Sequence, residues 1–325
     1  MMNLECSYMG LKMRNPLIVS SSGLSDNLDK IKAAADYGAG AVVLKSIFEE
    51  QINYQSGKLL GDSDYPEASD YIAYYTKTHS LDNYLKLIRS AKEATDIPII
   101  PSINCVTADD WISFAKQIQS AGADALEVNM FFLPLDEKLS PEKAEKIYLS
   151  LVEKLRKTLQ IPFAIKLGQR FSNIFYLIDQ LYKRGVDGVV LFNRFFEPDI
   201  DINSMNIIPA SVFSSGDDKR HVLRWVGMAS AINNRMSISA STGVRTGDDI
   251  VKYLLAGADA VQVCSILYSE GHEYIRELLA SVESWMKSKG FNNIEEFRGR
   301  LNYRNFKDFK KYERAQFMKY FSAYE

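Results

Sequence analysis

Small polar residues follow two β-rich runs in the last third of the chain. The runs span residues 236–240 and 258–263, and the residues after them are Ser241, Thr242, Gly243, Cys264 and Ser265. Backbone N–H groups and hydroxyls on two such neighbouring loops surround one point, and a phosphate dianion binds well there when a helix begins beside it. The spacing therefore predicts a phosphate site, in which Gly243 lets the backbone approach the ligand closely.

Strand-like and helix-like segments alternate along the chain and must position this site. Further β-rich runs occupy residues 16–22, 40–46, 97–104, 123–129, 161–167 and 186–193. Helical patterns follow these runs. This order is typical of a parallel sheet covered by helices, so the sequence predicts an α/β fold, a (β/α)₈ TIM barrel.

Two segments fall outside the strand and helix alternation. Residues 47–80 form a loop after the second strand that is longer than an ordinary connection, which is typical of a lid or a binding loop. Residues 302–325 place aromatic and basic side chains at helical spacing. We expect one ligand-binding barrel domain over 1–301 and a C-terminal helical extension over 302–325, packed on the barrel or on a second subunit.

Functional groups in such barrels lie at the carboxyl ends of the strands. Two lysines and several amides lie at these ends, among them Lys45, Asn129, Lys166 and Asn193. They converge on the same mouth as the phosphate site, which indicates a ligand with a phosphate on one side and a polar, electron-accepting ring in the middle. The isoalloxazine of FMN fits this description. The two lysines would favour its anionic reduced form, and the two asparagines are placed to bind a substrate.

The composition narrows the class of protein. The formal net charge of −2 predicts neither a nucleic-acid partner nor a membrane partner. Cys6, Cys105 and Cys264 are too few and too scattered for a disulfide framework or a metal site, so we expect no metal and a reducing compartment. No apolar run reaches the roughly 18 residues of a membrane span. These features predict a cytoplasmic protein that acts on a small molecule.

The chain resembles the FMN-dependent dihydroorotate dehydrogenases, particularly their soluble class. The resemblance runs from the NP…SSG opening at residues 15–23, through Lys45 and Ser46, to IEEFRGRL at residues 294–301, and it is strongest over residues 241–265. It implies an eight-stranded barrel, bound FMN, a homodimer, and oxidation of dihydroorotate at a CH–CH bond in pyrimidine biosynthesis, by hydride transfer to flavin N5.

The resemblance also implies roles for individual residues. Thr242, Gly243, Cys264 and Ser265 correspond to the segments that bind the FMN phosphate. Lys45, Asn129, Lys166 and Asn193 correspond to flavin and substrate contacts, and we expect Lys45, Asn129 and Asn193 to take part in catalysis. Further flavin contacts are implied at Ser22, Gly23, Ser46, Ser215 and Gly216.

The chain departs from the family where the substrate is handled. The family carries a cysteine or serine three residues after the asparagine of the fourth strand, and that residue removes the substrate proton. Phe132 stands there in this chain and cannot accept a proton. The loop that contacts the orotate carboxylate is replaced by residues 76–87, with His79 among its few polar side chains. Cys105 and His79 are the candidate substitute bases. We expect the substrate to be dihydroorotate or a related small polar acid.

Two alternatives remain open at this level. The first is a non-redox barrel enzyme that acts on a phosphosugar-type substrate, with Lys166 or Lys45 as a Schiff-base or electrophilic residue. The second is a flavin-binding protein without catalytic activity. Both keep the phosphate site and differ in what the rest of the mouth does.

Overall fold

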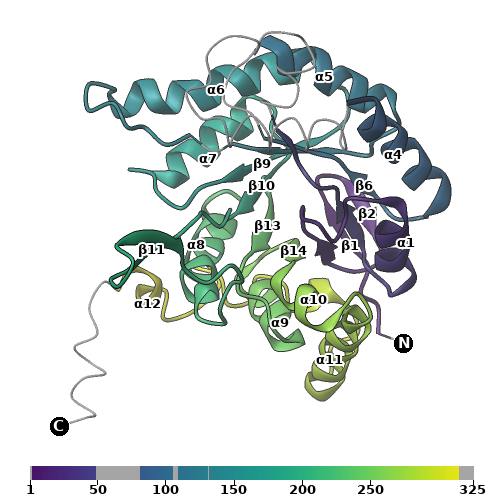
Figure 1. Cartoon of the computed structure of the whole chain (residues 1–325). Coiled ribbons are helices and arrows are strands. Elements are labelled where there is room, and N and C mark those ends of the chain that lie inside the picture. Colours follow the sequence, from purple (N-terminus) through teal and green to yellow (C-terminus); the bar gives the residue numbers. More distant parts are fainter. Residues whose placement is uncertain (1, 49–80, 105–108, 131, 315–325) are drawn as a thin grey trace.

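The centre of the computed structural model is a curled parallel sheet (Figure 1). The structure describes residues 2–48, 81–104, 109–130 and 132–314. The strands of the sheet are β3 (Leu17–Val19), β4 (Ala41–Val43), β5 (Ile47–Phe48), β6 (Ile99–Ile100), β7 (Ser102–Asn104), β8 (Leu126–Asn129), β9 (Phe163–Leu167), β10 (Gly188–Leu191), β13 (Ser237–Ser241) and β14 (Ala260–Val263). They follow the order β5-β7-β8-β9-β10-β13-β14-β3-β4-β6, and every neighbouring pair is parallel.

Two of the barrel strands are interrupted, which explains the ten segments. β6 and β7 are halves of one strand with Pro101 between them, and β4 and β5 are halves of the strand beside it. β4 pairs with β6, whereas β7 pairs with both β5 and β8. The two ends of the sheet order, β5 and β6, therefore belong to neighbouring strands of the barrel, and the sheet closes. The predicted eight-stranded (β/α)₈ barrel is confirmed.

Amphipathic helices surround the sheet (Figure 1). They are α1 (Leu28–Asp36), α4 (Leu81–Ala94), α5 (Asp109–Ser120), α6 (Pro141–Thr158), α7 (Ile174–Lys183), α8 (Asp218–Ile232), α9 (Gly247–Ala256), α10 (Ser265–Glu270) and α11 (Tyr274–Lys289). α7 buries Ile174, Leu177, Ile178 and Leu181, the spacing of a single helix face. None of the helices in the described residues is long and apolar enough to cross a membrane.

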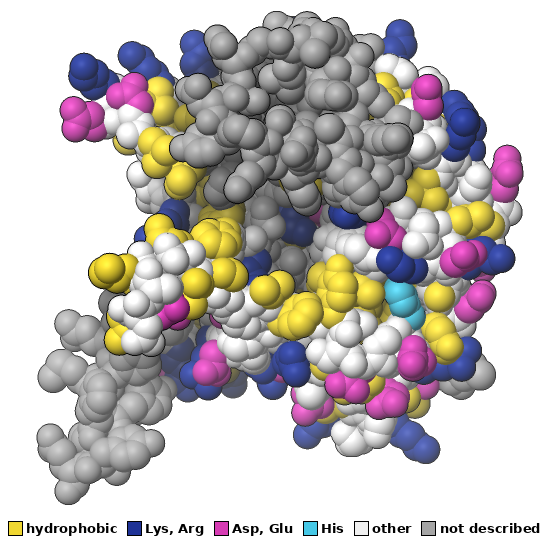
Figure 2. All heavy atoms as spheres, in the orientation of Figure 1, with side chains coloured by type: hydrophobic (Ala, Val, Ile, Leu, Met, Phe, Trp, Pro, Cys, Tyr) yellow, Lys and Arg dark blue, Asp and Glu magenta, His cyan; other side chains and the backbone are white. Residues whose placement is uncertain are grey.

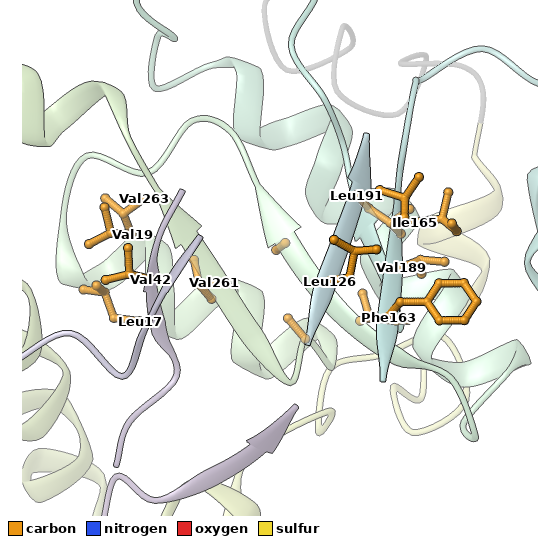
Figure 3. Packing of buried hydrophobic residues seen from close by; sticks show 14 of the residues in the cluster. Leu17, Val19, Val42, Leu126, Phe163, Ile165, Val189, Leu191, Val261 and Val263 are labelled. Carbon is orange, nitrogen blue, oxygen red and sulfur yellow. The ribbon is translucent and has the colours of Figure 1, made fainter. Parts of the chain in front are cut away.

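Alternate residues of the strands build two separate cores, because successive side chains of a strand point to opposite faces. The outer core fills the space between sheet and helices, and Figure 3 shows part of it, including Leu17 and Val19. The inner core fills the barrel with residues such as Ile18, Val43 and Ala164. Tyr8 and Met9 join this inner core from the hairpin of β1 (Cys6–Tyr8) and β2 (Leu11–Met13), which covers one end of the barrel.

Two excursions leave the barrel. The hairpin of β11 (Pro198–Asp201) and β12 (Asn206–Pro209) follows β10, and its strands pair antiparallel. Near the C-terminus, η1 (Ile294–Glu296) and α12 (Lys310–Glu313) follow α11. The backbone N–H of Tyr303 donates to the carbonyl of Gly227 in α8 at 2.9 Å. The domain boundary after residue 301 stays a prediction, and residues 49–80 of the predicted loop and 315–325 of the extension lie outside the described residues.

Candidate cofactor and substrate site

A cavity of about 360 Å³ lies at the carboxyl ends of the barrel strands. β9, β10, β13 and β14 and the segments after them supply most of its wall, together with Ser20 and Ser21 after β3. Its polar lining residues are Ser20, Ser21, Lys166, Asn193, Arg194, Glu197, Ser211, Ser214, Ser241, Thr242, Gly243, Gln262, Cys264 and Ser265. Six of the residues predicted to bind the cofactor therefore line a single cavity: Lys166, Asn193, Thr242, Gly243, Cys264 and Ser265.

One end of the cavity is a cluster of hydroxyls and backbone N–H groups. The Ser265 hydroxyl oxygen accepts hydrogen bonds from the backbone N–H and the hydroxyl of Ser214, each at 3.0 Å. The backbone N–H of Gly243 donates to Ser214 Oγ at 3.4 Å. Three segments that are distant in the sequence thus bring their donors to one point, as a phosphate site requires.

Glycine is required at position 243 for two reasons. Its φ is +78°, a conformation that residues with a side chain rarely adopt. In addition, a Cβ there would lie 2.4 Å from the backbone nitrogen of Lys219, in the first turn of α8. The loop after β13 consequently rests directly on the N-terminus of α8. The same approach brings unsatisfied helix N–H groups beside the hydroxyl cluster, which suits an anion.

The floor of the cavity is a buried polar network around Lys166. Lys166 Nζ lies 3.5 Å from Glu127 Oε1 and donates to Gln262 Oε1 at 3.2 Å. The Ser20 hydroxyl also donates to Gln262 Oε1, at 3.0 Å. The ion pair keeps an ammonium charge beneath the cavity, where a bound ring would meet it. A charged, paired ammonium is suited to electrostatic stabilisation and poorly suited to nucleophilic attack.

Asn129 and Asn193 lie together on the same side of the mouth. Asn193 Nδ2 donates to Asn129 Oδ1 at 2.9 Å. Asn129 is in register with Lys166 across β8 and β9, and the backbone N–H of Asn193 donates to the carbonyl of Leu167 at 2.8 Å. Three adjacent strands therefore carry the two amides and the ammonium that the sequence analysis assigned to flavin and substrate.

The remaining predicted contacts are not among the described residues that line the cavity. The backbone N–H of Ser46 donates to the hydroxyl of the lining residue Ser21 at 2.9 Å, so Ser46 contacts the cavity wall from outside. Lys45 is half-buried at the end of β4. A Cβ on Gly23 would lie 2.8 Å from the Tyr268 hydroxyl oxygen, and Ser22 donates to the carbonyl of Ser20 at 3.2 Å. Ser215 and Gly216 follow the lining residue Ser214.

Phe132, at the family's base position, is half-buried and packs against the outer core. The two substitute bases, Cys105 and His79, lie outside the described residues. Cys264 lines the cavity, but burial raises the pKa of its thiol, against opposing effects of a hydrogen bond with Ser22 and the charge of Lys166. A thiol that keeps its proton is a weak nucleophile. No cluster of metal-ligating side chains occurs in the part of the chain that the structure describes.

Sequence reasoning missed several lining residues. Arg194 follows Asn193, and its guanidinium donates to the carbonyls of Val212 and Ser211 at 2.5 and 2.6 Å. The side chain thereby closes the base of the β11–β12 excursion. Gln262 was missed as well, although it is a polar residue at an inward position of an otherwise apolar strand. That alternation was the signal that could have identified it.

Comparisons with known proteins agree with this geometry. The family model described as dihydroorotate dehydrogenase matches residues 3–286. The catalytic subunit of dihydroorotate dehydrogenase B (NAD(+)) from Thermoplasma acidophilum is 27% identical over 92% of this chain and 99% of the relative. The chloroplastic dihydropyrimidine dehydrogenase (NADP(+)) of Arabidopsis thaliana is 25% identical over 91% of this chain and 76% of its own length. The Escherichia coli NAD-dependent dihydropyrimidine dehydrogenase subunit PreA is 26% identical, with 92% and 77% covered.

Proposed function

The chain belongs to the dihydroorotate dehydrogenase family, and we propose that it is an FMN-dependent oxidoreductase acting on a CH–CH bond of a small polar acid or cyclic amide. Enzymes of this family are flavoproteins. The observation that carries the proposal is the cavity itself, in which a hydroxyl and N–H cluster lies at one end and a buried ammonium lies on the floor.

The residues present fit FMN. Ser214, Gly243 and Ser265 would hold the phosphate, because their donors already converge and no side chain stands at position 243. Lys166 would lie at the ring, and Asn193 with Asn129 would border it. When bound, the flavin supplies two-electron redox chemistry that the side chains of the protein lack.

The side chains of the protein would perform three tasks around the ring. Lys166 holds positive charge where negative charge develops, and its position is set before any ligand binds. Asn129 and Asn193 orient polar groups of the substrate. Arg194 adds a second cationic side chain to the described lining, where it pairs with Glu197 at 3.3 Å.

Dihydroorotate and dihydropyrimidines are the substrate types named in the relatives. Both types are compatible with two cations and two amides at the mouth. Phe132 bears on the choice, because the proton acceptor that the family uses is missing from this position. We therefore propose a related polar dihydro compound as the substrate, with dihydroorotate itself as the first compound to test.

The experiment is direct. We expect the purified chain to be yellow and to release FMN on denaturation, and Lys166→Met to bind FMN more weakly. Anaerobic mixing with dihydroorotate and then with dihydropyrimidines should bleach the flavin with the true substrate. A colourless protein that does not bind added FMN would refute the proposal, and trapping of a carbonyl compound on Lys166 by borohydride would favour the non-redox alternative.

Two further expectations accompany the proposal. A yellow protein that no dihydro compound reduces would be the flavin-binding protein without catalytic activity. We also propose a homodimer in the cytoplasm, following the resemblance to the soluble class. Light scattering of the purified chain would test the dimer.

A further inference from the structure

Two opposite charges are buried together beneath the cavity. The side chains of Glu127, on β8, and Lys166, on β9, belong to residues that are 2% and 6% exposed. Their nearest charged atoms are 3.5 Å apart. Most ion pairs on a protein surface contribute little, but removing one partner of a buried pair leaves an uncompensated charge in a poorly solvated place.

Gln262, on β14, hydrogen-bonds to both charged groups, and these two bonds fix the orientation of its side-chain amide. Its Nε2 group donates to Glu127 Oε2 at 2.5 Å, and its Oε1 accepts from Lys166 Nζ at 3.2 Å. The reverse orientation would place the amide N–H groups against the ammonium. The carboxylate, the amide and the ammonium therefore form one hydrogen-bonded network, and its cavity end is Lys166, since Lys166 lines the cavity and Glu127 does not.

Among the described groups that face Glu127 inside the barrel, none other than Lys166 carries the opposite charge. Ala125, Ala164 and Ala260 fill the inner core, and Tyr8 closes it. Burial, with smaller effects of Glu127 and Asp259, raises the pKa of the Tyr8 hydroxyl well above its usual range, so this group stays neutral. Within the described part of the chain, neither the Tyr8 hydroxyl nor Glu127 Oε1 has a hydrogen-bond partner, and Glu127 Oε1 faces the ammonium at ion-pair distance.

We propose that Glu127 is a positioning residue that, through Gln262 and by direct charge pairing, keeps Lys166 protonated and fixed at the floor of the cavity. Glu127 contacts no ligand in this role and acts only through the lysine. The inference about the pair stands on the protein alone, and its consequence for a bound flavin rests on the proposed function.

The first test uses the full chain without added FMN. We would compare the thermal unfolding of the wild type, Glu127→Gln and Glu127→Gln/Lys166→Met from about pH 7 to about pH 9. A buried lysine without a counterion releases its proton at lower pH than the unfolded chain, which holds it to about pH 10.4. Stability rises with pH where the unfolded state binds more protons. The stability deficit of Glu127→Gln should therefore shrink as the pH rises, and the double variant should show no such trend.

The titratable groups around the pair do not interfere in this window. Tyr8 stays neutral, and burial raises the pKa of the Cys264 thiol above its ordinary value. Burial also raises the pKa of Asp259, to about 6, below the window. Asp179→Asn is the matched control, because it removes one carboxylate from a partly exposed pair, with Lys183. It should leave the pH profile of the wild type unchanged.

Each outcome of the unfolding test either supports or overturns the inference. A Glu127→Gln profile parallel to that of the wild type would overturn the inference. If Glu127→Gln fails to fold while the double variant folds, the uncompensated ammonium is the cause and the inference is supported. If the double variant also fails to fold, the damage does not come from the charge of the lysine and the inference is wrong.

The second test measures the reduction potential of bound FMN. Loss of the ammonium charge disfavours the anionic reduced flavin, so Glu127→Gln should lower the equilibrium ratio of reduced to oxidised flavin about tenfold, which is roughly 30 mV for a two-electron couple. In the Lys166→Met background the same substitution should lower it no further, and an equal decrease in both backgrounds would mean that Glu127 does not act through Lys166. Failure to bind FMN would refute the proposed function and leave the unfolding result on the pair intact.

Discussion

The floor and the rim of the cavity are built in opposite ways. The floor consists of buried side chains on barrel strands that bind one another, as Lys166, Gln262 and Glu127 do. The rim includes the β11–β12 hairpin, where Ile200 and Ile207 face each other across the strands and are 65% and 73% exposed. Figure 2 shows apolar side chains gathered over this hairpin.

The difference indicates which part of the molecule carries the family's common chemistry. Side chains on the floor are positioned by a closed sheet and by each other, so a substitution there disturbs several partners at once. The rim hairpin projects from the barrel and has exposed side chains, so it can change with less effect on the sheet. We therefore expect cofactor binding to depend on the floor, and substrate choice to depend on the rim.

The largest effect should follow a change where the loop after β13, at the hydroxyl cluster, meets α8. Gly243→Ala combines the positive φ with a Cβ 2.4 Å from a backbone nitrogen, so the loop must move. We expect a loss of about 1–3 kcal/mol of stability from overpacking, in addition to the cost of the positive φ. FMN affinity should fall about 100-fold, or about 2.8 kcal/mol. Calorimetric titration and thermal unfolding measure the two effects.

The chain offers a matched control for this prediction. Gly10 has a φ of +77°, nearly the same as Gly243, but a Cβ there would meet nothing within 4 Å. Gly10→Ala should therefore cost only the backbone term, about 1–2 kcal/mol, and leave FMN affinity unchanged. If both variants bound FMN as the wild type does, the close approach at Gly243 would have no part in holding the cofactor.

An intermediate effect is expected at Arg194, which holds the base of the β11–β12 excursion. Arg194→Met keeps the apolar stem but removes the donors to the carbonyls of Ser211 and Val212. Hydrogen bonds from charged groups contribute about 1.5–3 kcal/mol. We expect faster limited proteolysis within residues 196–213 and about a tenfold rise in substrate KM, with FMN affinity nearly unchanged.

A similar change at an exposed pair serves as the comparison. Arg220 pairs with Asp217 at 2.9 Å, with 78% and 76% of the two side chains exposed, so Arg220→Met should change neither proteolysis nor KM. Equal behaviour of the two arginine variants would show that Arg194 does not fasten the excursion.

The same contrast explains how far the sequence could predict the site. Lys166, Asn193 and Gly243 were identified because they follow apolar runs whose ends must meet in a barrel. Glu127 was not, although it is a polar residue within an apolar strand as Gln262 is, because the sequence does not show which strand carries its partner. Ser214 was missed by one residue in favour of Ser215, because the path of the chain after the hairpin depends on tertiary contacts such as those of Arg194.

The smallest effect should follow a polar substitution on the hairpin. Ile200→Ser removes an apolar side chain from a face that is already in solvent, so stability should change by no more than about 0.5 kcal/mol and FMN affinity should stay the same. Val189→Ser on β10 is the buried counterpart, with 0% exposure, and should cost several-fold more. Thermal unfolding and analytical ultracentrifugation distinguish the cases. A marked loss of stability in Ile200→Ser, together with a smaller sedimentation coefficient, would mean that a second copy covers this face in solution. The hairpin would then be buried in the assembly, as the floor is buried in the monomer.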